Sequence, residues 1–182
     1  MEEQTTGCLV CGAPLEYFPS QIEMECTYCH KTFMSNARCV NGHFICDSCH
    51  EQMGLRVIED ICRHTDSKDP VAIMKKIILS PYIYMHGPEP HVLVGSALLA
   101  AYKNAGGELD LDAALEEMRN RGAQVPGGIC GLWGTCGAAV STGIFVSLIT
   151  GASPLSGKEW GLCNEMTSRS LGAIAKTGGP RC

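Results

Sequence analysis

Four closely spaced pairs of metal-ligating residues occupy the first fifty positions and constrain the fold more than any other feature. The pairs are Cys8-x2-Cys11, Cys26-x2-Cys29, Cys39-x3-His43 and Cys46-x2-Cys49. Each pair spans a tight turn that directs both side chains the same way, and two pairs supply the tetrahedral ligand set of zinc. A segment of about sixty residues cannot bury a large core, so bound metal would supply much of its folding energy.

The order of these pairs along the chain predicts two sequential zinc sites. The stretch 15–26, between the first two pairs, alternates roughly between apolar and polar residues and predicts a hairpin. The first expected site is a zinc ribbon whose ligands are Cys8, Cys11, Cys26 and Cys29.

The second expected site follows directly. We favour His43 as its fourth ligand, with Cys62 and His64 as alternatives, and we expect His50 to be a surface residue. A turn at 41–42, followed by a helix that the Cys46-x2-Cys49 pair opens and that runs through 51–61, resembles the order of elements in treble-clef and RING-type zinc modules. The favoured ligand set is Cys39, His43, Cys46 and Cys49. Both sites have four protein ligands, which is typical of structural zinc.

Cysteine usage and charge limit the cellular setting and the partners. The N-terminus, MEEQTTGC, lacks the basic and apolar regions of a secretory signal, so we expect a cytoplasmic protein. In that compartment twelve cysteines indicate metal ligands or reactive thiols. Residues 1–66 carry four Lys or Arg against ten Asp or Glu. This acidic balance argues against nucleic-acid binding and favours a protein partner.

We expect two domains, a double zinc-binding module over 1–66 and an all-α helical bundle over 67–182. Helix starts are marked by Asp69 before Pro70, by Pro90, by Asp110 and by a Ser156-x2-Glu159 capping box. The helix after Pro90 is apolar nearly all round and is therefore expected to be the central, buried one.

Residues 122–157 contain no charged side chain, so this stretch has to be tested as a membrane span. Glycines at 127, 128, 131, 134 and 137 interrupt it and leave a continuous helix only over 137–150. That length suits a core helix, and we expect no membrane span.

Cys130 and Cys136 lie in the glycine-rich part of this stretch and are the main candidates for a chemical site. Cys136 falls at the start of the 137–150 helix, where unpaired N–H groups favour a thiolate. Cys163 and Cys182 bring the sulfurs outside the zinc module to four, the number that a 4Fe–4S cluster requires. Buried or free reactive thiols are the alternative.

A loop with two histidines and a carboxylate precedes the central helix. His86, Glu89 and His91 can serve as acid–base groups or metal ligands, with the alternative that the loop only caps the helix. Arg181, beside Cys182 in GGPRC, is expected to close the site formed by Cys130 and Cys136.

Three motifs together resemble an uncharacterised family of anaerobic prokaryotes, especially methanogens. They are HGPEPHVLV, GGICGLWGTCGAAVSTGIFVSLITGASPLS and GGPRC, and such proteins occur alone or beside S-adenosylmethionine-dependent domains. The segment GTCGAAVSTG is also similar to the GCAxxG motif of small redox-type proteins. That similarity implies an iron–sulfur or thiol role for Cys130 and Cys136.

These observations favour a redox or sulfur-handling enzyme, or a subunit of one, with structural zinc at its N-terminus. A zinc-dependent adaptor that binds a protein partner is the first alternative. The second is an accessory protein of a S-adenosylmethionine-dependent methyl or radical enzyme, which the resemblance alone implies. A homodimer is the oligomer that we consider beside the monomer.

Overall fold

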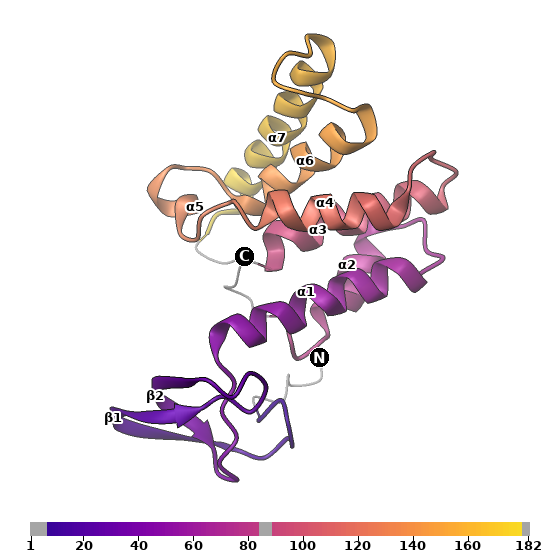
Figure 1. The fold of residues 1–182 in the computed structure, drawn as a ribbon. Helices are drawn as coiled ribbons and strands as arrows, with labels where there is room; N and C mark the ends of the chain where they lie inside the picture. The colour runs from indigo at the N-terminus through magenta and orange to yellow at the C-terminus, as the bar shows by residue number, and fades with distance from the viewer. Residues whose placement is uncertain (1–6, 84–88, 180–182) are drawn as a thin grey trace.

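The computed structural model describes residues 7–83 and 89–179, which form a two-stranded hairpin followed by seven helices (Figure 1). His86, Arg181 and Cys182 lie outside the described residues. The elements are β1 (Leu15–Glu25), β2 (Thr32–Cys39), α1 (Asp47–His64), α2 (Pro70–Ile78), α3 (Glu89–Asn104), α4 (Leu111–Gly122), α5 (Ile129–Leu132), α6 (Gly137–Thr150) and α7 (Lys158–Thr177). The predicted architecture, a small cysteine-rich module followed by an all-α domain, is confirmed.

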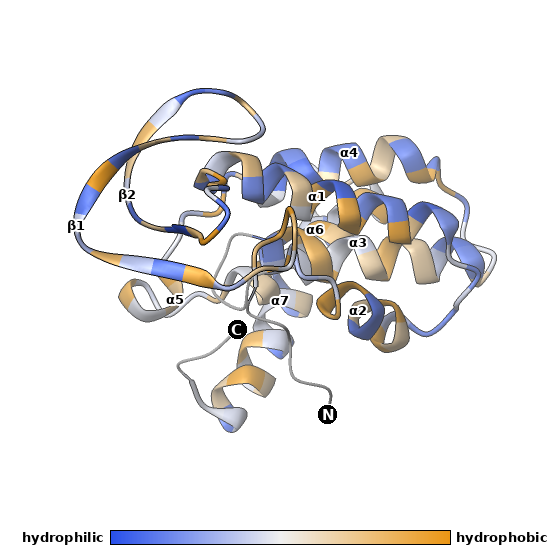
Figure 2. Cartoon of the chain, turned by 90° about the horizontal axis from the view of Figure 1, so that it is seen from below, coloured by the Kyte–Doolittle hydropathy of each residue, from blue (hydrophilic) through white to orange (hydrophobic). Residues whose placement is uncertain are grey.

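The hairpin uses different residues from those predicted. The stretch 15–26 does not fold back on itself; it forms β1, which pairs with β2 in antiparallel register from Leu15 opposite Cys39 to Glu25 opposite Thr32. Residues 18–21 interrupt the pairing, because Tyr17 lies opposite Ala37 and Ile22 opposite Ser35. Such a bulge bends a strand, and Figure 2 shows the hairpin as a curved ribbon beside the helices.

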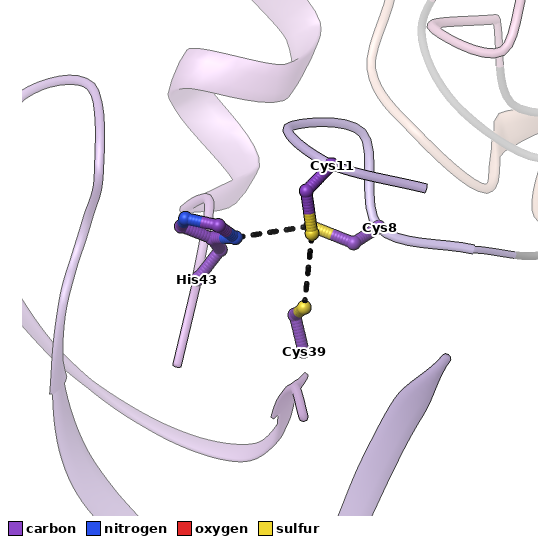
Figure 3. A group of neighbouring side chains, drawn as sticks. All are labelled: Cys8, Cys11, Cys39 and His43. Carbon is purple, nitrogen blue, oxygen red and sulfur yellow. Dashed lines mark hydrogen bonds between the residues drawn. The ribbon is translucent and has the colours of Figure 1, made fainter. Parts of the chain in front are cut away.

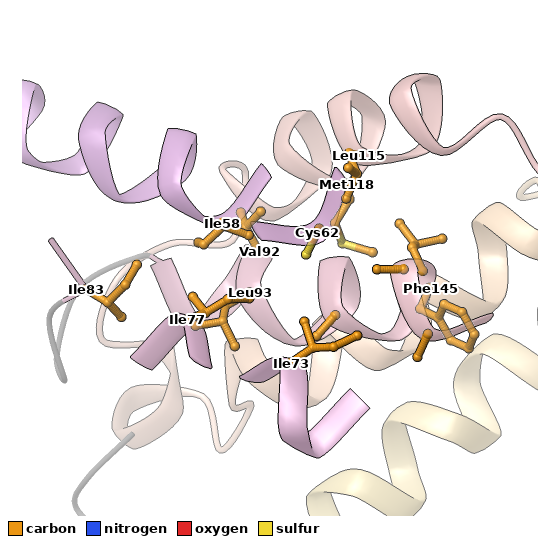
Figure 4. Close-up of a cluster of buried hydrophobic side chains, with 14 of the residues drawn as sticks. Ile58, Cys62, Ile73, Ile77, Ile83, Val92, Leu93, Leu115, Met118 and Phe145 are labelled. Carbon is orange, nitrogen blue, oxygen red and sulfur yellow. The ribbon is translucent and has the colours of Figure 1, made fainter. Parts of the chain in front are cut away.

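Helix α3 is the centre of the helical domain, as predicted. It packs against α1, α2, α4 and α6, and its alanine-rich sequence lets these helices approach closely. Each fully buried Leu, Ile or Met in this core contributes about 1.5–3 kcal/mol. The largest of them, several of which appear in Figure 4, are Ile58, Ile73, Ile77, Leu99, Leu115 and Met118.

Helix α1 joins the module to the helical domain. It begins within the Cys46-x2-Cys49 pair, as predicted, and continues past residue 61 to His64, and Ile58 and Cys62 belong to the buried core. Burial raises the pKa of Cys62 to about 12, so this residue is a core thiol. His64 is exposed, with Nδ1 2.8 Å from the Asp60 carbonyl oxygen. The structure therefore gives neither alternative fourth ligand a place at a metal site.

Two of the three predicted side-chain caps are confirmed. Asp69 accepts a hydrogen bond from the Val71 amide at 2.9 Å, and Asp110 accepts one from the Ala113 amide at 3.1 Å. The capping box is wrong, because α7 begins after Gly157 and has no side-chain cap. Ser156 instead accepts a hydrogen bond from the Ser153 amide, a local bond that competes with capping.

No helix within the described residues is long and apolar enough to cross a membrane. Helix α6 covers the predicted 137–150 and packs on α3, α4 and α7. The uncharged stretch therefore contributes a helix to the core.

Close approach of α3, α4 and α6 requires Gly95. Its amide donates a 2.8 Å hydrogen bond to Ser141 Oγ. A methyl group at this position would overlap the Met118 side chain and lie 2.9 Å from the Ser141 carbonyl oxygen.

We predict that Gly95→Ala lowers the free energy of unfolding by about 1–3 kcal/mol through overpacking. Gly172→Ala is the matched control, because a methyl group there meets no atom within 4 Å. It should raise helix stability by about 0.5–1 kcal/mol. Thermal melts of the two variants measure both effects, and an equal response would contradict this account of the interface.

Candidate metal centres and thiol site

The eight predicted ligands gather in two groups, but the grouping differs from the sequential one. In each group the ligand atoms all lie within 4.8 Å of one another. The first and third pairs meet, and so do the second and fourth, so the predicted sequential sites are wrong. The groups are Cys8, Cys11, Cys39 and His43, and Cys26, Cys29, Cys46 and Cys49.

The register of the hairpin explains this interleaving. We call the turn spanned by each ligand pair a knuckle. Leu15 lies opposite Cys39, so the knuckle of Cys8 and Cys11, which precedes β1, lies beside the end of β2. The pair Cys26 and Cys29 lies in the turn at the other end of the hairpin. There the Thr27 amide donates a 2.8 Å hydrogen bond to the carbonyl oxygen of Phe44, two residues before Cys46.

The first group has the dimensions of a tetrahedral zinc centre (Figure 3). Cys8 Sγ is 3.8 Å from His43 Nδ1, and Cys11 Sγ is 3.5 Å from Cys39 Sγ. Zinc–sulfur bonds of about 2.3 Å imply ligand–ligand distances of about 3.8 Å in a tetrahedron. The four side chains are therefore suited to hold a metal ion such as zinc between them.

The second group is built on the N-terminus of α1. Cys46 is the N-cap residue of this helix, and its Sγ lies 3.8 Å from Cys29 Sγ. The Cys46 amide points at Cys26 Sγ at 3.4 Å. Amides and the helix terminus stabilise negative charge here, which favours thiolate ligands.

Three of the four knuckles share one backbone design. The amides of Cys8, Cys26 and Cys39 each donate to a carbonyl oxygen four or five residues later, at 2.8, 2.9 and 2.8 Å. Each turn closes through a residue with positive φ, namely Gly12 at 72°, His30 at 57° and Gly42 at 86°. His30 is the only residue other than glycine with positive φ in the described chain, and its position was not detected from the sequence.

The thiols of the two groups differ in how readily they ionise. The Ala13 backbone and the Asn41 side chain lower the pKa of Cys11 to about 6. Burial raises the pKa of Cys26, but hydrogen bonds led by the Cys46 backbone outweigh it, and the result is about 6. Burial and neighbouring sulfurs raise the pKa of Cys49 to about 12. The second group thus combines an easily ionised thiol, Cys26, with a thiol, Cys49, that must lose a proton when metal binds.

In the helical domain, Cys130, Cys136 and His91 line one cavity of about 20 Å³. Cys130 lies on α5, Cys136 is the N-cap residue of α6, and His91 comes from the first turn of α3. The cavity has room for one water molecule or an atom of similar size. The structure therefore brings together three of the predicted site residues.

Two glycines of this segment have identifiable roles. Gly134 has a φ of 66° and permits the turn between the two cysteines. Gly137 makes room for the His91 ring, which a methyl group at that position would overlap. A side chain at Gly131 would meet no atom within 4 Å, so this glycine makes no close contact.

Glu89 does not join this cavity, although it lies only two residues before His91. Successive residues of a helix are rotated by about 100°, so positions two apart point to nearly opposite sides. Glu89 is 1% exposed and faces α1, where its Oε1 lies 3.8 Å from His50 Nδ1. Gly54 provides the space, because a methyl group there would lie 2.9 Å from Glu89 Cγ.

His50 is buried beside Glu89, so the prediction of a surface histidine is wrong. Its place in the first turn of α1, directly after Cys49, could have suggested a contact with the helical domain. Burial raises the pKa of Glu89 and lowers the pKa of His50 and His91. Burial therefore favours the neutral forms of all three side chains.

Cys163 is also separated from Cys130 and Cys136. It lines an open groove between α4, α6 and α7 together with Arg121, Val140 and Ile144. Within the described residues, groups of three or more metal-ligating side chains occur only in the N-terminal module. The structure offers no support for an iron–sulfur centre that includes Cys163.

The comparisons with known proteins place the helical domain in a family. Residues 58–182 match the model of DUF5714, described as a family of unknown function. Because the match covers more than half of the chain, the protein belongs to this family. The matched region begins inside α1, after all eight residues of the two candidate metal centres. The comparisons with curated proteins and with solved structures found no match.

The interleaved grouping can be tested with two matched double variants. Cys8→Ser with Cys39→Ser removes two ligands from one centre, whereas Cys8→Ser with Cys26→Ser removes one ligand from each. We predict that the first variant retains one tightly bound zinc ion per chain and that the second retains none tightly. Zinc analysis after dialysis against a competing chelator measures this. Sequential sites would give the opposite result.

Glu89 should make stability depend on pH. Because its pKa is raised in the folded protein, its neutral form contributes stability at acidic pH, and this contribution is lost as pH rises through the folded pKa. Glu89→Gln keeps the side chain neutral, so its melting temperature relative to the wild type should increase from mildly acidic to mildly alkaline pH at saturating zinc. The exposed Glu108→Gln is the control, and a parallel response of both variants would contradict this prediction.

Proposed function

We propose that this protein is a zinc-dependent thiol protein that carries out redox or sulfur-handling chemistry in its helical domain. The observation that carries the proposal is the cavity at the N-terminus of α6, which is lined by Cys130, Cys136 and His91. The N-terminal module has a structural role in this proposal, and its ligand sets are suited to two zinc ions.

A structural role for zinc is supported by the completeness of both ligand sets. Each group already supplies four side chains, so a tetrahedral ion would have no position left for water or substrate. The hairpin and its knuckles bury few large apolar side chains. Metal binding would therefore provide folding free energy for this part of the chain.

A chemical role for the cavity is supported by the properties of its lining residues. The α6 terminus has no side-chain cap, so its amide groups can stabilise a thiolate at Cys136. His91 is held mainly neutral by burial and can accept a thiol proton. An iron–sulfur cluster on Cys130, Cys136, Cys163 and Cys182 has less support, because Cys163 lines a separate groove.

We predict that Cys130 and Cys136 react with iodoacetamide at least about tenfold faster than Cys163 in the zinc-saturated, anaerobically purified protein. Cys163 is the internal control, because it is a half-buried thiol outside the cavity. Peptide mass spectrometry at several times gives the rates, and iron and sulfide analysis of the same sample tests the cluster. A sample without iron, sulfide or a fast-reacting cysteine would refute the proposal.

A zinc-dependent adaptor that binds a protein partner is the second candidate. Three large apolar side chains of the N-terminal module, Tyr17, Met34 and Val40, are more than half exposed. The module is also acidic, as the sequence shows, and this combination suits a basic and partly apolar protein surface. The alkylation experiment separates the two candidates, because an adaptor requires no reactive thiol.

A further inference from the structure

We propose that Cys130 and Cys136 form a reversible dithiol–disulfide pair that exchanges with disulfide substrates. This inference rests on the thiol site of the proposed function and assigns its reaction and its substrate class.

The backbone between the two cysteines closes a short loop. The Thr135 amide donates to the Ile129 carbonyl oxygen at 3.4 Å, and the Trp133 amide donates to the same oxygen at 2.8 Å. The residues that precede the two cysteines are thereby held together. Cys130 and Cys136 follow them directly and line the same cavity, so both thiols are available at one site for disulfide formation.

The cavity is not arranged like the metal centres of the same chain. In the N-terminal module each ligand set converges to within 4.8 Å, whereas Cys130, Cys136 and His91 do not form such a group among the described residues. Two cysteines and one histidine around a cavity of one-atom size suit bond formation between two sulfurs better than coordination of an ion.

The two thiols differ in access, which assigns their order of reaction. Cys130 is exposed and Cys136 is half-buried. A cavity of about 20 Å³ cannot admit the body of a substrate. A disulfide substrate therefore meets Cys130 first, and Cys136 acts second from inside.

Two further features support Cys136 as the second nucleophile. It occupies the uncapped N-terminus of a fourteen-residue helix, which stabilises the attacking thiolate. His91 lines the same cavity and is 9% exposed, and the Nε2 edge of its ring faces the start of α6, where a methyl group on Gly137 would overlap it. A buried imidazole nitrogen of this kind can take up the proton that Cys136 releases.

The proposed reaction balances in two exchange steps. The Cys130 thiolate attacks one sulfur of the substrate, forming a mixed disulfide and releasing the first substrate thiolate. The Cys136 thiolate then attacks the Cys130 sulfur, forming the internal disulfide and releasing the second. The pair loses two electrons and two protons, and the substrate disulfide is reduced to two thiols. A dithiol substrate reverses the reaction.

The surface beside Cys130 indicates which disulfides fit best. Leu132 and Trp133 are 82% and 70% exposed and follow Cys130 within three residues. Apolar side chains at this exposure offer contact area to a peptide chain. We therefore infer that the substrate is a disulfide carried by a peptide or protein, with small disulfides reacting more slowly.

The test uses the reduced, zinc-saturated full chain with two disulfides, glutathione disulfide and a disulfide-bonded peptide. Intact-mass spectrometry should show the loss of two hydrogen atoms, with peptide mapping linking Cys130 to Cys136. Cys136→Ser should accumulate the mixed disulfide between Cys130 and the substrate. Cys130→Ser should slow reduction of the substrate disulfide by about tenfold or more. Cys163→Ser is the matched control and should behave as the wild type. The peptide should react faster than glutathione disulfide.

Three results would overturn the inference: a stable substrate adduct on the wild-type protein, a link from either cysteine to Cys163 or Cys182, or equal rates for Cys130→Ser and the wild type. Rapid alkylation of Cys130 and Cys136 without disulfide exchange would reject this inference and leave the proposed thiol site intact. Slow alkylation of both in a sample without iron and sulfide would reject the proposed function as well.

Discussion

The antiparallel register of β1 and β2 is the constraint on which the N-terminal module depends. With Leu15 opposite Cys39, the first and third ligand pairs meet at one end of the hairpin, and the second pair is carried to the other end. The two centres nevertheless stay close, because His43 precedes Cys46 by only three residues, a reach of at most about 11 Å. The bulge at 18–21 lets the hairpin bend, so that ligand pairs at its opposite ends can belong to two centres that lie close together.

Helix α1 transmits this arrangement to the rest of the molecule. Its first residues follow Cys46 in the second centre, and its later residues Ile58 and Cys62 belong to the core around α3. Tyr82 adds a second connection, because its hydroxyl donates to the Leu9 carbonyl oxygen at 3.4 Å in the first knuckle. Metal binding and packing of the helical domain are therefore coupled through shared elements.

Helix α3 separates two polar sites that the sequence places together. Glu89 faces α1 and His50, whereas His91 faces the cavity at the start of α6. Each site depends on a glycine that leaves room for a side chain, Gly54 for Glu89 and Gly137 for His91. One of the two described acid–base candidates therefore lines the cavity with Cys130 and Cys136, and the other lies at the junction with α1.

The sequence by itself determined the eight residues suited to hold metal ions, the central buried helix and the caps at Asp69 and Asp110, because these depend on spacing within a few residues. It also identified Cys130 and Cys136 beside a helix start. Only the tertiary structure decided which ligand pairs share a centre, that Cys163 stands apart, and that His50 is buried. Those outcomes depend on strand register and helix packing, which join residues that are distant along the chain and leave no local pattern.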